Sequence, residues 1–234
     1  MTYSTLTTAV LGLSFTALAC EMAPSTVTGP TPPAGGLPAG AAINGGSTES
    51  IGPVVRIADG AEVGSSRLVR TPNGINFSLS TADLTPGHAY TLWFVAFNEP
   101  AGCLVANVCG PDDVVNDAAK PDMMYATGRV AGGGGTPTFS GRIRAGDASG
   151  SINAPVGLPS YGLMVPFEAQ VILALHDHGP KLPAYLPDMI QTVDGGCTDA
   201  GIPTAGVMSP WNAHPFGRRG PNTCVTTQVS IHRP

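Results

Sequence analysis

Charged residues are scarce in this sequence, because Asp, Glu, Lys and Arg make up only 12% of its 234 residues. Only 11 residues are Lys or Arg, they form no basic run, and the formal net charge is -5. Proteins bind nucleic acids and anionic lipid surfaces through clustered positive charge. The composition therefore predicts no nucleic-acid partner.

Long hydrophobic segments are also absent, and the longest uncharged apolar stretch covers only residues 6–19. It is shorter than the roughly 20 residues of a membrane-spanning helix and ends in small residues, as signal peptides do. We therefore interpret residues 1–19 as a signal peptide. Its end, TALAC, resembles the bacterial lipobox, in which the cysteine after the cleavage site carries a diacylglycerol. This predicts an exported protein of the cell envelope with a lipid anchor at Cys20; cleavage near Ala19 to give a soluble periplasmic or extracellular protein is the alternative.

Residues 20–50 show no hydrophobic period and consist largely of Pro, Gly, Ser, Thr and Ala. Such a segment cannot bury enough apolar surface to fold. We expect a disordered tether over residues 20–50. A single domain over residues 51–234 follows, since a chain of this length suffices for one domain of ordinary size.

The 31 glycines and 23 prolines disfavour helices and favour short strands joined by tight turns. Apolar and alternating runs predict seven or eight strands. The one helical stretch is PDDVVNDAAKP, residues 111–121, with Asp112 as a candidate cap. We predict an all-β fold, a two-sheet antiparallel sandwich of the immunoglobulin or fibronectin type III kind with one short helix. A closed β-barrel is the alternative.

Three local patterns add detail to this fold. INFSLS, residues 75–80, alternates between apolar and polar residues, and TPNG before it predicts a hairpin turn. The apolar run at residues 89–98 indicates a central strand with Trp93 buried. Four glycines at residues 132–135 separate two strand-like runs. They predict a second hairpin, because glycine readily adopts the positive φ angles of its turn.

Five cysteines are present. Setting Cys20 aside leaves four, an even number that indicates disulfides in an exported chain. We favour pairing Cys103 with Cys109 and Cys197 with Cys224, because each pair brackets a loop rich in Gly and Pro. A zinc site of four thiolates is the competing interpretation, but no C-x-x-C spacing supports it.

Several segments, in this order, are similar to those of a family of exported bacterial β-sandwich proteins without an assigned function. They are LTPGHAYTLWFVAFNEPAGC, CGPDD, YATGRVAGGGGTPTFSGRI, LHDHGP, VDGGC and CVTTQVSIH, within residues 66–233. The resemblance implies the same sandwich and favours the disulfide pairing above, but it transfers no activity. In that family the element His178-Gly179-Pro180 is typical, whereas a basic residue other than histidine often stands at the position of His176. This departure weakens the case for a shared H-x-H metal site.

The run VILALHDHGP, residues 171–180, ends a strand-like segment with two histidines. Residues i and i+2 of a strand point to the same face about 7 Å apart, so His176 and His178 can bind one zinc or copper ion. His232, at the end of the last strand, is the best candidate for a third ligand. In the alternative without metal, His178 hydrogen-bonds the backbone of the following turn and His176 lies half exposed.

A long loop inside the bracket formed by the last two cysteines carries aromatic and basic residues. They are Trp211, His214, Phe216, Arg218 and Arg219. Loops on rigid scaffolds often carry recognition sites, and a stacking aromatic beside arginines suits a glycan or a peptide. Alternatively, Trp211 and Phe216 fold back over an open edge of the sandwich.

The motifs H-E-x-x-H, G-x-x-x-x-G-K-[ST] and G-x-G-x-x-G do not occur in the sequence. We therefore expect no cofactor and a non-enzymatic role, as an envelope β-sandwich that binds a glycan or a protein. The alternative is a metal-binding protein or metalloenzyme that uses His176 and His178.

Overall fold

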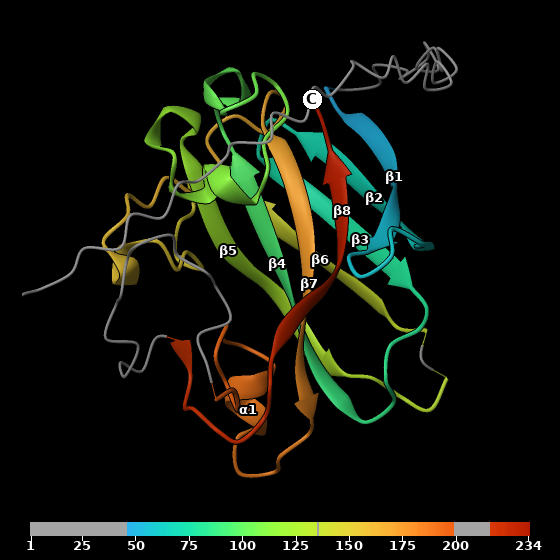
Figure 1. The fold of residues 1–234 in the computed structure, drawn as a ribbon. Helices are drawn as coiled ribbons and strands as arrows, with labels where there is room; N and C mark the ends of the chain where they lie inside the picture. Colours follow the sequence, from blue (N-terminus) through green and yellow to red (C-terminus); the bar gives the residue numbers. More distant parts are fainter. Residues whose placement is uncertain (1–45, 135, 199–215) are drawn as a thin grey trace, which may run out of the picture. The chain divides into compact units, whose positions relative to one another are not determined.

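The computed structural model describes residues 46–134, 136–198 and 216–234, which belong to one compact unit (Figure 1). The expected signal peptide, Cys20 and most of the expected tether lie outside these residues, as do Trp211 and His214. Among the described residues, no helix has the length and apolar character needed to cross a membrane.

Antiparallel strands dominate the described part of the chain. They are β1 (Thr48–Arg56), β2 (Glu62–Thr71), β3 (Gly74–Thr81), β4 (His88–Phe97), β5 (Pro121–Val130), β6 (Thr138–Arg144), β7 (Gln170–Pro180) and β8 (Val225–His232). All eight belong to one sheet in the order β5-β4-β7-β8-β1-β2-β3-β6. The all-β prediction is confirmed.

The strands form one continuous sheet, which is nearer to the barrel alternative than to a sandwich of two separate sheets. Its halves, β5-β4-β7-β8 and β1-β2-β3-β6, join where β1 meets β8. Only two residue pairs link these strands, Val55 with Val229 and Arg56 with Gln228. Side chains from both halves nevertheless enter one core, so the sheet curves around it.

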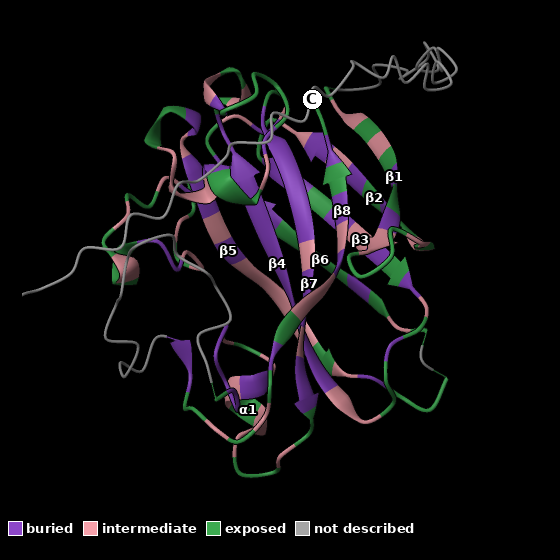
Figure 2. Cartoon of the chain, viewed as in Figure 1, coloured by how far each residue is buried: buried purple, intermediate pink, exposed green. Residues whose placement is uncertain are grey.

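The main hydrophobic core contains side chains from both halves. It includes Leu68, Ile75 and Phe77 from β2 and β3, Leu92 and Phe94 from β4, and Leu173 and Leu175 from β7. Burial alternates along β3, as the pattern INFSLS predicts. By contrast, β4 is buried on both faces, as predicted, and Trp93 is only 3% exposed. Figure 2 shows β4 and β7 as the most continuously buried strands.

The turn TPNG joins β2 to β3 as predicted, since Thr71 pairs with Gly74 and leaves a two-residue turn between them. The sequence pattern did not predict β1, which begins at Thr48, inside the expected tether. Its Gly52 and Pro53 have low strand propensity, so the local sequence does not indicate a strand. Eight residue pairs with β2 hold it in the sheet all the same, so tertiary pairing overrides weak local propensity.

The hairpin predicted around residues 132–135 is wrong, because β5 and β6 do not pair with each other; Gly135 itself lies outside the described residues. β5 pairs with β4 and β6 pairs with β3, so this segment connects the two edges of the sheet. Gly132, Gly133 and Gly134 are not among the glycines with positive φ. Glycines can mark a connection, but they do not determine which strands pair across it.

The expected helix at residues 111–121 is a pair of 3-10 turns, Pro111–Val115 and Asp117–Ala119. Asp113, rather than Asp112, accepts the backbone N–H of Gly110 at the start of the first turn, and it also accepts that of Leu104 in the preceding loop. One α-helical turn that the sequence did not predict, α1 (Leu186–Met189), follows β7.

Candidate functional site: a histidine pair beside a disulfide

His176 and His178 lie near the end of β7, on the face of the sheet opposite the main core. Side chains alternate along a strand, so Leu173 and Leu175 enter the main core while the two histidines point the other way. The histidines share a face as predicted, with ring centroids 4.9 Å apart and rings at 81° to each other. Both are buried, contrary to the expectation of a half-exposed His176.

Two described parts of the chain after α1, residues 193–198 and 216–222, cover this face of β7. Backbone hydrogen bonds join Gly196 to Arg218 and to Asn222, so two segments separated in sequence form one layer. The Nδ2 of Asn222 donates to the carbonyls of His178 and Pro180, both at 2.8 Å. These bonds fix the layer to the end of β7 and bury both imidazoles.

Both ring nitrogens of His178 have hydrogen-bond partners. Its Nδ1 lies 2.9 Å from the carbonyl of Gly195, which can only accept, so the proton sits on Nδ1. Its Nε2 then accepts from the hydroxyl of Thr91 at 2.8 Å, and Thr91 accepts from the indole N–H of Trp93 at 3.0 Å. The predicted bond to the Gly179-Pro180 turn is not the one that His178 makes. Burial lowers its pKa to about 4, against opposing effects of the Gly195 carbonyl and Asp177.

His176 is only partly satisfied. Its Nδ1 lies 3.2 Å from the hydroxyl of Thr226, the residue opposite it on β8. Its Nε2 is buried and has no hydrogen-bond partner. Burial, with a smaller contribution from nearby His178, lowers the pKa of His176 to about 3, so the ring is neutral at physiological pH.

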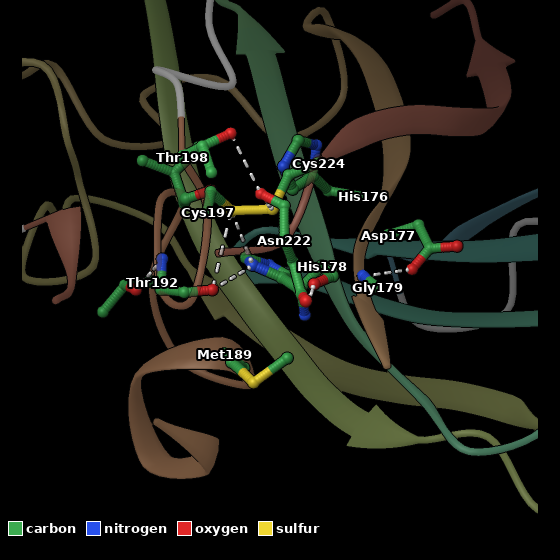
Figure 3. Close-up of a disulfide and its surroundings, with 12 residues drawn as sticks. His176, Asp177, His178, Gly179, Met189, Thr192, Cys197, Thr198, Asn222 and Cys224 are labelled. Atoms are coloured by element: carbon green, nitrogen blue, oxygen red, sulfur yellow. Dashed lines mark hydrogen bonds between the residues drawn. A yellow bond between two sulfur atoms is a disulfide. The ribbon is translucent and has the colours of Figure 1, made fainter. Parts of the chain in front are cut away.

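The disulfide between Cys197 and Cys224 lies against the two histidines, as Figure 3 shows. The Sγ of Cys197 is 3.5 Å from the Nδ1 of His178. One ligand atom from each of the four side chains lies within 4.8 Å of the other three. Two imidazoles and two sulfur atoms, all buried, therefore meet at one point of the fold.

His232 does not join this group. It is opposite Val171 on β7, five residues from His176, which corresponds to about 17 Å along a strand. Val171 faces the main core, and a paired residue shares its partner's face, so His232 lies on the other side of the sheet. There it contacts the hydroxyls of Ser66, at 2.7 Å, and Ser50, at 2.9 Å. The three-histidine metal site is wrong for this geometric reason.

The predicted ligand-binding loop is only partly within the described residues. Phe216 is buried and packs in a cluster with Trp93, which agrees with the alternative that it folds back over the sheet. Arg218 forms an ion pair with Asp188 at 2.7 Å. Arg219 is exposed. Among the described residues of this loop, Phe216 therefore contributes to packing and Arg218 to a surface ion pair.

Both predicted disulfides are present, Cys103 with Cys109 and Cys197 with Cys224, which rules out the site of four thiolates. Sequence reasoning missed that the second disulfide lies beside His176 and His178. No local signal could have revealed it, because the loop reaches the histidines only through tertiary hydrogen bonds. A scan against protein-family models and searches of curated proteins and of solved structures found no match to this chain.

Proposed function

We propose that this chain is an exported, lipid-anchored domain of the cell envelope that binds a ligand without catalysing a reaction. The observation that supports this most directly is the pairing of four cysteines into two disulfides. Disulfides persist in oxidising compartments. The fifth cysteine, Cys20, ends the lipobox-like TALAC and is the proposed site of the anchor.

Intact-mass measurement of the protein extracted from membranes tests the anchor. We expect a mature N-terminus at Cys20 that carries acyl mass. A different N-terminal residue, or an N-terminus without acyl mass, rejects the anchor and supports a soluble periplasmic or extracellular protein.

The loop closed by the first disulfide offers a surface for the ligand. Leu104 and Val105 are 71% and 62% exposed in a loop whose ends are joined covalently. Asp113 further fixes it by accepting the backbone N–H of Leu104 at 2.7 Å. Apolar side chains presented on a rigid loop are typical of protein recognition.

A pocket of about 100 Å³ lies in the turns that follow this loop in the sequence. Its lining includes Val114, Val115, Pro121, Leu158 and Tyr161. We propose that an envelope protein binds here and inserts one apolar side chain into the pocket. The loop favours a protein over a glycan, because Leu104 and Val105 are aliphatic whereas sugars are held mainly by hydrogen bonds and aromatic stacking. The pocket adds the polar Asp117 and Asn153 to its apolar lining.

Site-specific photo-crosslinking in intact cells tests this surface. A crosslinker at Val105 should capture one discrete protein, and Leu158→Arg should abolish the capture because it fills the pocket with charge. A crosslinker at Ile57, which is 52% exposed, is the control and should not capture it. Equal capture at both positions, or capture that survives Leu158→Arg, contradicts the proposal.

The second candidate function is metal binding by His176 and His178. One observation favours it, the buried Nε2 of His176 that lacks a partner. The test is the metal content of the purified protein. Stoichiometric zinc or copper that disappears in His178→Ala supports this function, and protein that stays metal-free in both the oxidised and the reduced state opposes it.

A further inference from the structure

The four side chains around the second disulfide form a nearly complete set of zinc ligands. His176, His178, Cys197 and Cys224 come from β7 and from two parts of the covering layer, and their ligand atoms lie within 4.8 Å of one another. Two imidazole nitrogens and two thiolate sulfurs are a set that proteins use for tetrahedral zinc. The bond between the sulfur atoms and the proton on the Nδ1 of His178 separate this arrangement from such a site.

The disulfide and a bound zinc ion exclude each other. Two sulfur ligands at about 2.3 Å from a tetrahedral zinc lie about 3.8 Å apart, whereas disulfide sulfurs lie about 2 Å apart. Sulfur in a disulfide is also uncharged and a much weaker ligand than a thiolate. Zinc binding by all four residues therefore requires reduction.

We propose that the Cys197–Cys224 disulfide controls a zinc site by its redox state. A dithiol reduces the disulfide, and both cysteines then bind Zn²⁺ together with His176 and His178. The inference develops the metal-binding candidate above. It does not depend on the lipid anchor or on the apolar loop, so its failure would leave those proposals standing.

Reduction would begin at Cys224. This residue keeps 7% of its surface exposed, whereas Cys197 has none. A thiolate of the dithiol bonds to the Sγ of Cys224, and the electron pair of the broken disulfide passes to the Sγ of Cys197. The Nδ1–H of His178, 3.5 Å away, is placed to donate to this leaving thiolate.

The second thiolate of the dithiol completes the exchange. It attacks its own sulfur in the mixed disulfide, which closes the reductant into a cyclic disulfide and releases the Cys224 thiolate. Two electrons and two protons pass from the dithiol to the two cysteines. When zinc binds, both thiol protons are released to solvent.

The surroundings of the histidines suit this change. Binding a metal through the unpartnered Nε2 would cost His176 no hydrogen bond. On His178, the nitrogen near the sulfur is Nδ1, so its proton must move to Nε2. The hydroxyl of Thr91, 2.8 Å from Nε2, can accept from it there, and a hydrogen bond of this kind commonly orients metal-bound imidazoles.

The other disulfide provides a matched control, since Cys103 and Cys109 do not belong to the His/Cys group. The test protein is the full chain with Cys103→Ser and Cys109→Ser, reduced with a phosphine and loaded with Zn²⁺. We expect one zinc ion per chain after desalting, and none when the same protein stays oxidised. The reciprocal Cys197→Ser/Cys224→Ser protein should bind none in either state.

Two readouts identify the ligands. Loading with Co²⁺ should give thiolate-to-cobalt charge-transfer absorption in the reduced test protein only. His176→Leu in the same background should weaken zinc binding more than about 100-fold, which is the upper end of what losing an outer partner costs. Reduced protein that stays folded by circular dichroism yet binds no zinc overturns the proposal, as does zinc binding that His176→Leu leaves unchanged or that equals binding to the oxidised form.

A second measurement on the natural sequence covers the case in which the serine variants do not fold. The reduced chain is alkylated with and without Zn²⁺, and the modified cysteines are mapped by mass spectrometry. Zinc should protect Cys197 and Cys224 while Cys103 and Cys109 react. Equal alkylation of all four in the presence of zinc contradicts the proposal.

Discussion

The two ends of the β7–β8 pair bury histidines in different ways. At one end, His232 faces the main core and both of its ring nitrogens meet serine hydroxyls, Nδ1 with Ser50 and Nε2 with Ser66. At the other end, His176 and His178 lie under a layer of loops, and the Nε2 of His176 has no partner. Burial with a smaller effect of Arg70 lowers the pKa of His232 to about 4.

The difference separates a structural site from a candidate functional one. A buried imidazole whose nitrogens are satisfied helps to hold neighbouring strands together, and here it joins β8 to β1 and β2. An unsatisfied buried nitrogen costs about 1–3 kcal/mol and stabilises nothing in return. Native folds rarely keep an unsatisfied buried group without a reason. An unsatisfied nitrogen close to two sulfur atoms therefore indicates a chemical role, such as metal binding, rather than a role in packing.

The largest expected effect is on stability in acid. The pKa values of His176, His178 and His232 in the fold are about 3, 4 and 4, below the ordinary 6.5. Between pH 6.5 and about 4 the unfolded chain binds protons that the fold excludes. Each histidine therefore lowers the unfolding free energy by about 1.4 kcal/mol for each unit that the pH falls.

Urea denaturation between pH 7.5 and 4.5 measures this slope, which should approach about 4 kcal/mol per pH unit for the three histidines together. His176→Leu and His232→Leu should each remove about one third of it. If a variant leaves this slope unchanged, the histidine that it replaces takes up its proton in the folded state as readily as in the unfolded chain. That histidine then does not contribute to the loss of stability in acid.

The disulfide beside the histidines should matter more than the other one. Replacing Cys197 and Cys224 by alanine should lower the unfolding free energy by about 3.6 kcal/mol, because the bridge closes a loop with a sequence separation of 27. Replacing Cys103 and Cys109, separated by 6, should cost about 2.2 kcal/mol. Chemical denaturation of both double variants gives the order, and the reverse order would contradict the loop-entropy account.

Replacing His178 should cost nearly as much as the larger disulfide. His178→Leu leaves the Gly195 carbonyl and the Thr91 hydroxyl without their partner, so we expect a loss of about 3 kcal/mol. His178→Gln, which can donate and accept, is the control and should recover part of this loss. Equal losses in the two variants would mean that ring packing, and not hydrogen bonding, makes His178 important.

The smallest effects test the comparison most directly. Ser66→Ala removes the partner of the Nε2 of His232 and should cost about 1–2 kcal/mol. His176→Leu removes the unpartnered Nε2, which stabilises the fold, and also the hydrogen bond between Nδ1 and Thr226, which destabilises it. The two changes oppose each other, so the net effect in the oxidised protein at pH 7.5 should stay within about 1 kcal/mol of zero. If denaturation curves show that His176→Leu lowers the unfolding free energy more than Ser66→Ala does, the histidines at the two ends of the β7–β8 pair both have structural roles.

Local pattern was sufficient for much of the architecture. The alternation in INFSLS, the TPNG turn and the buried Trp93 follow from side-chain period and turn chemistry, which act over a few residues. The disulfide pairing also followed from loop composition and an even number of cysteines. Local pattern failed at β1 and at residues 132–135, where the outcome depends on which strands become neighbours.

The sequence by itself therefore determined the all-β class, the shared face of His176 and His178, and the presence of two disulfides. Only the tertiary structure decided that His232 faces the other side of the sheet and that the second disulfide meets the histidine pair. The physical reason is the distance along the chain over which each kind of interaction acts. Strand period and turn chemistry act between residues near in sequence, whereas strand register and loop docking depend on contacts between segments far apart along the chain.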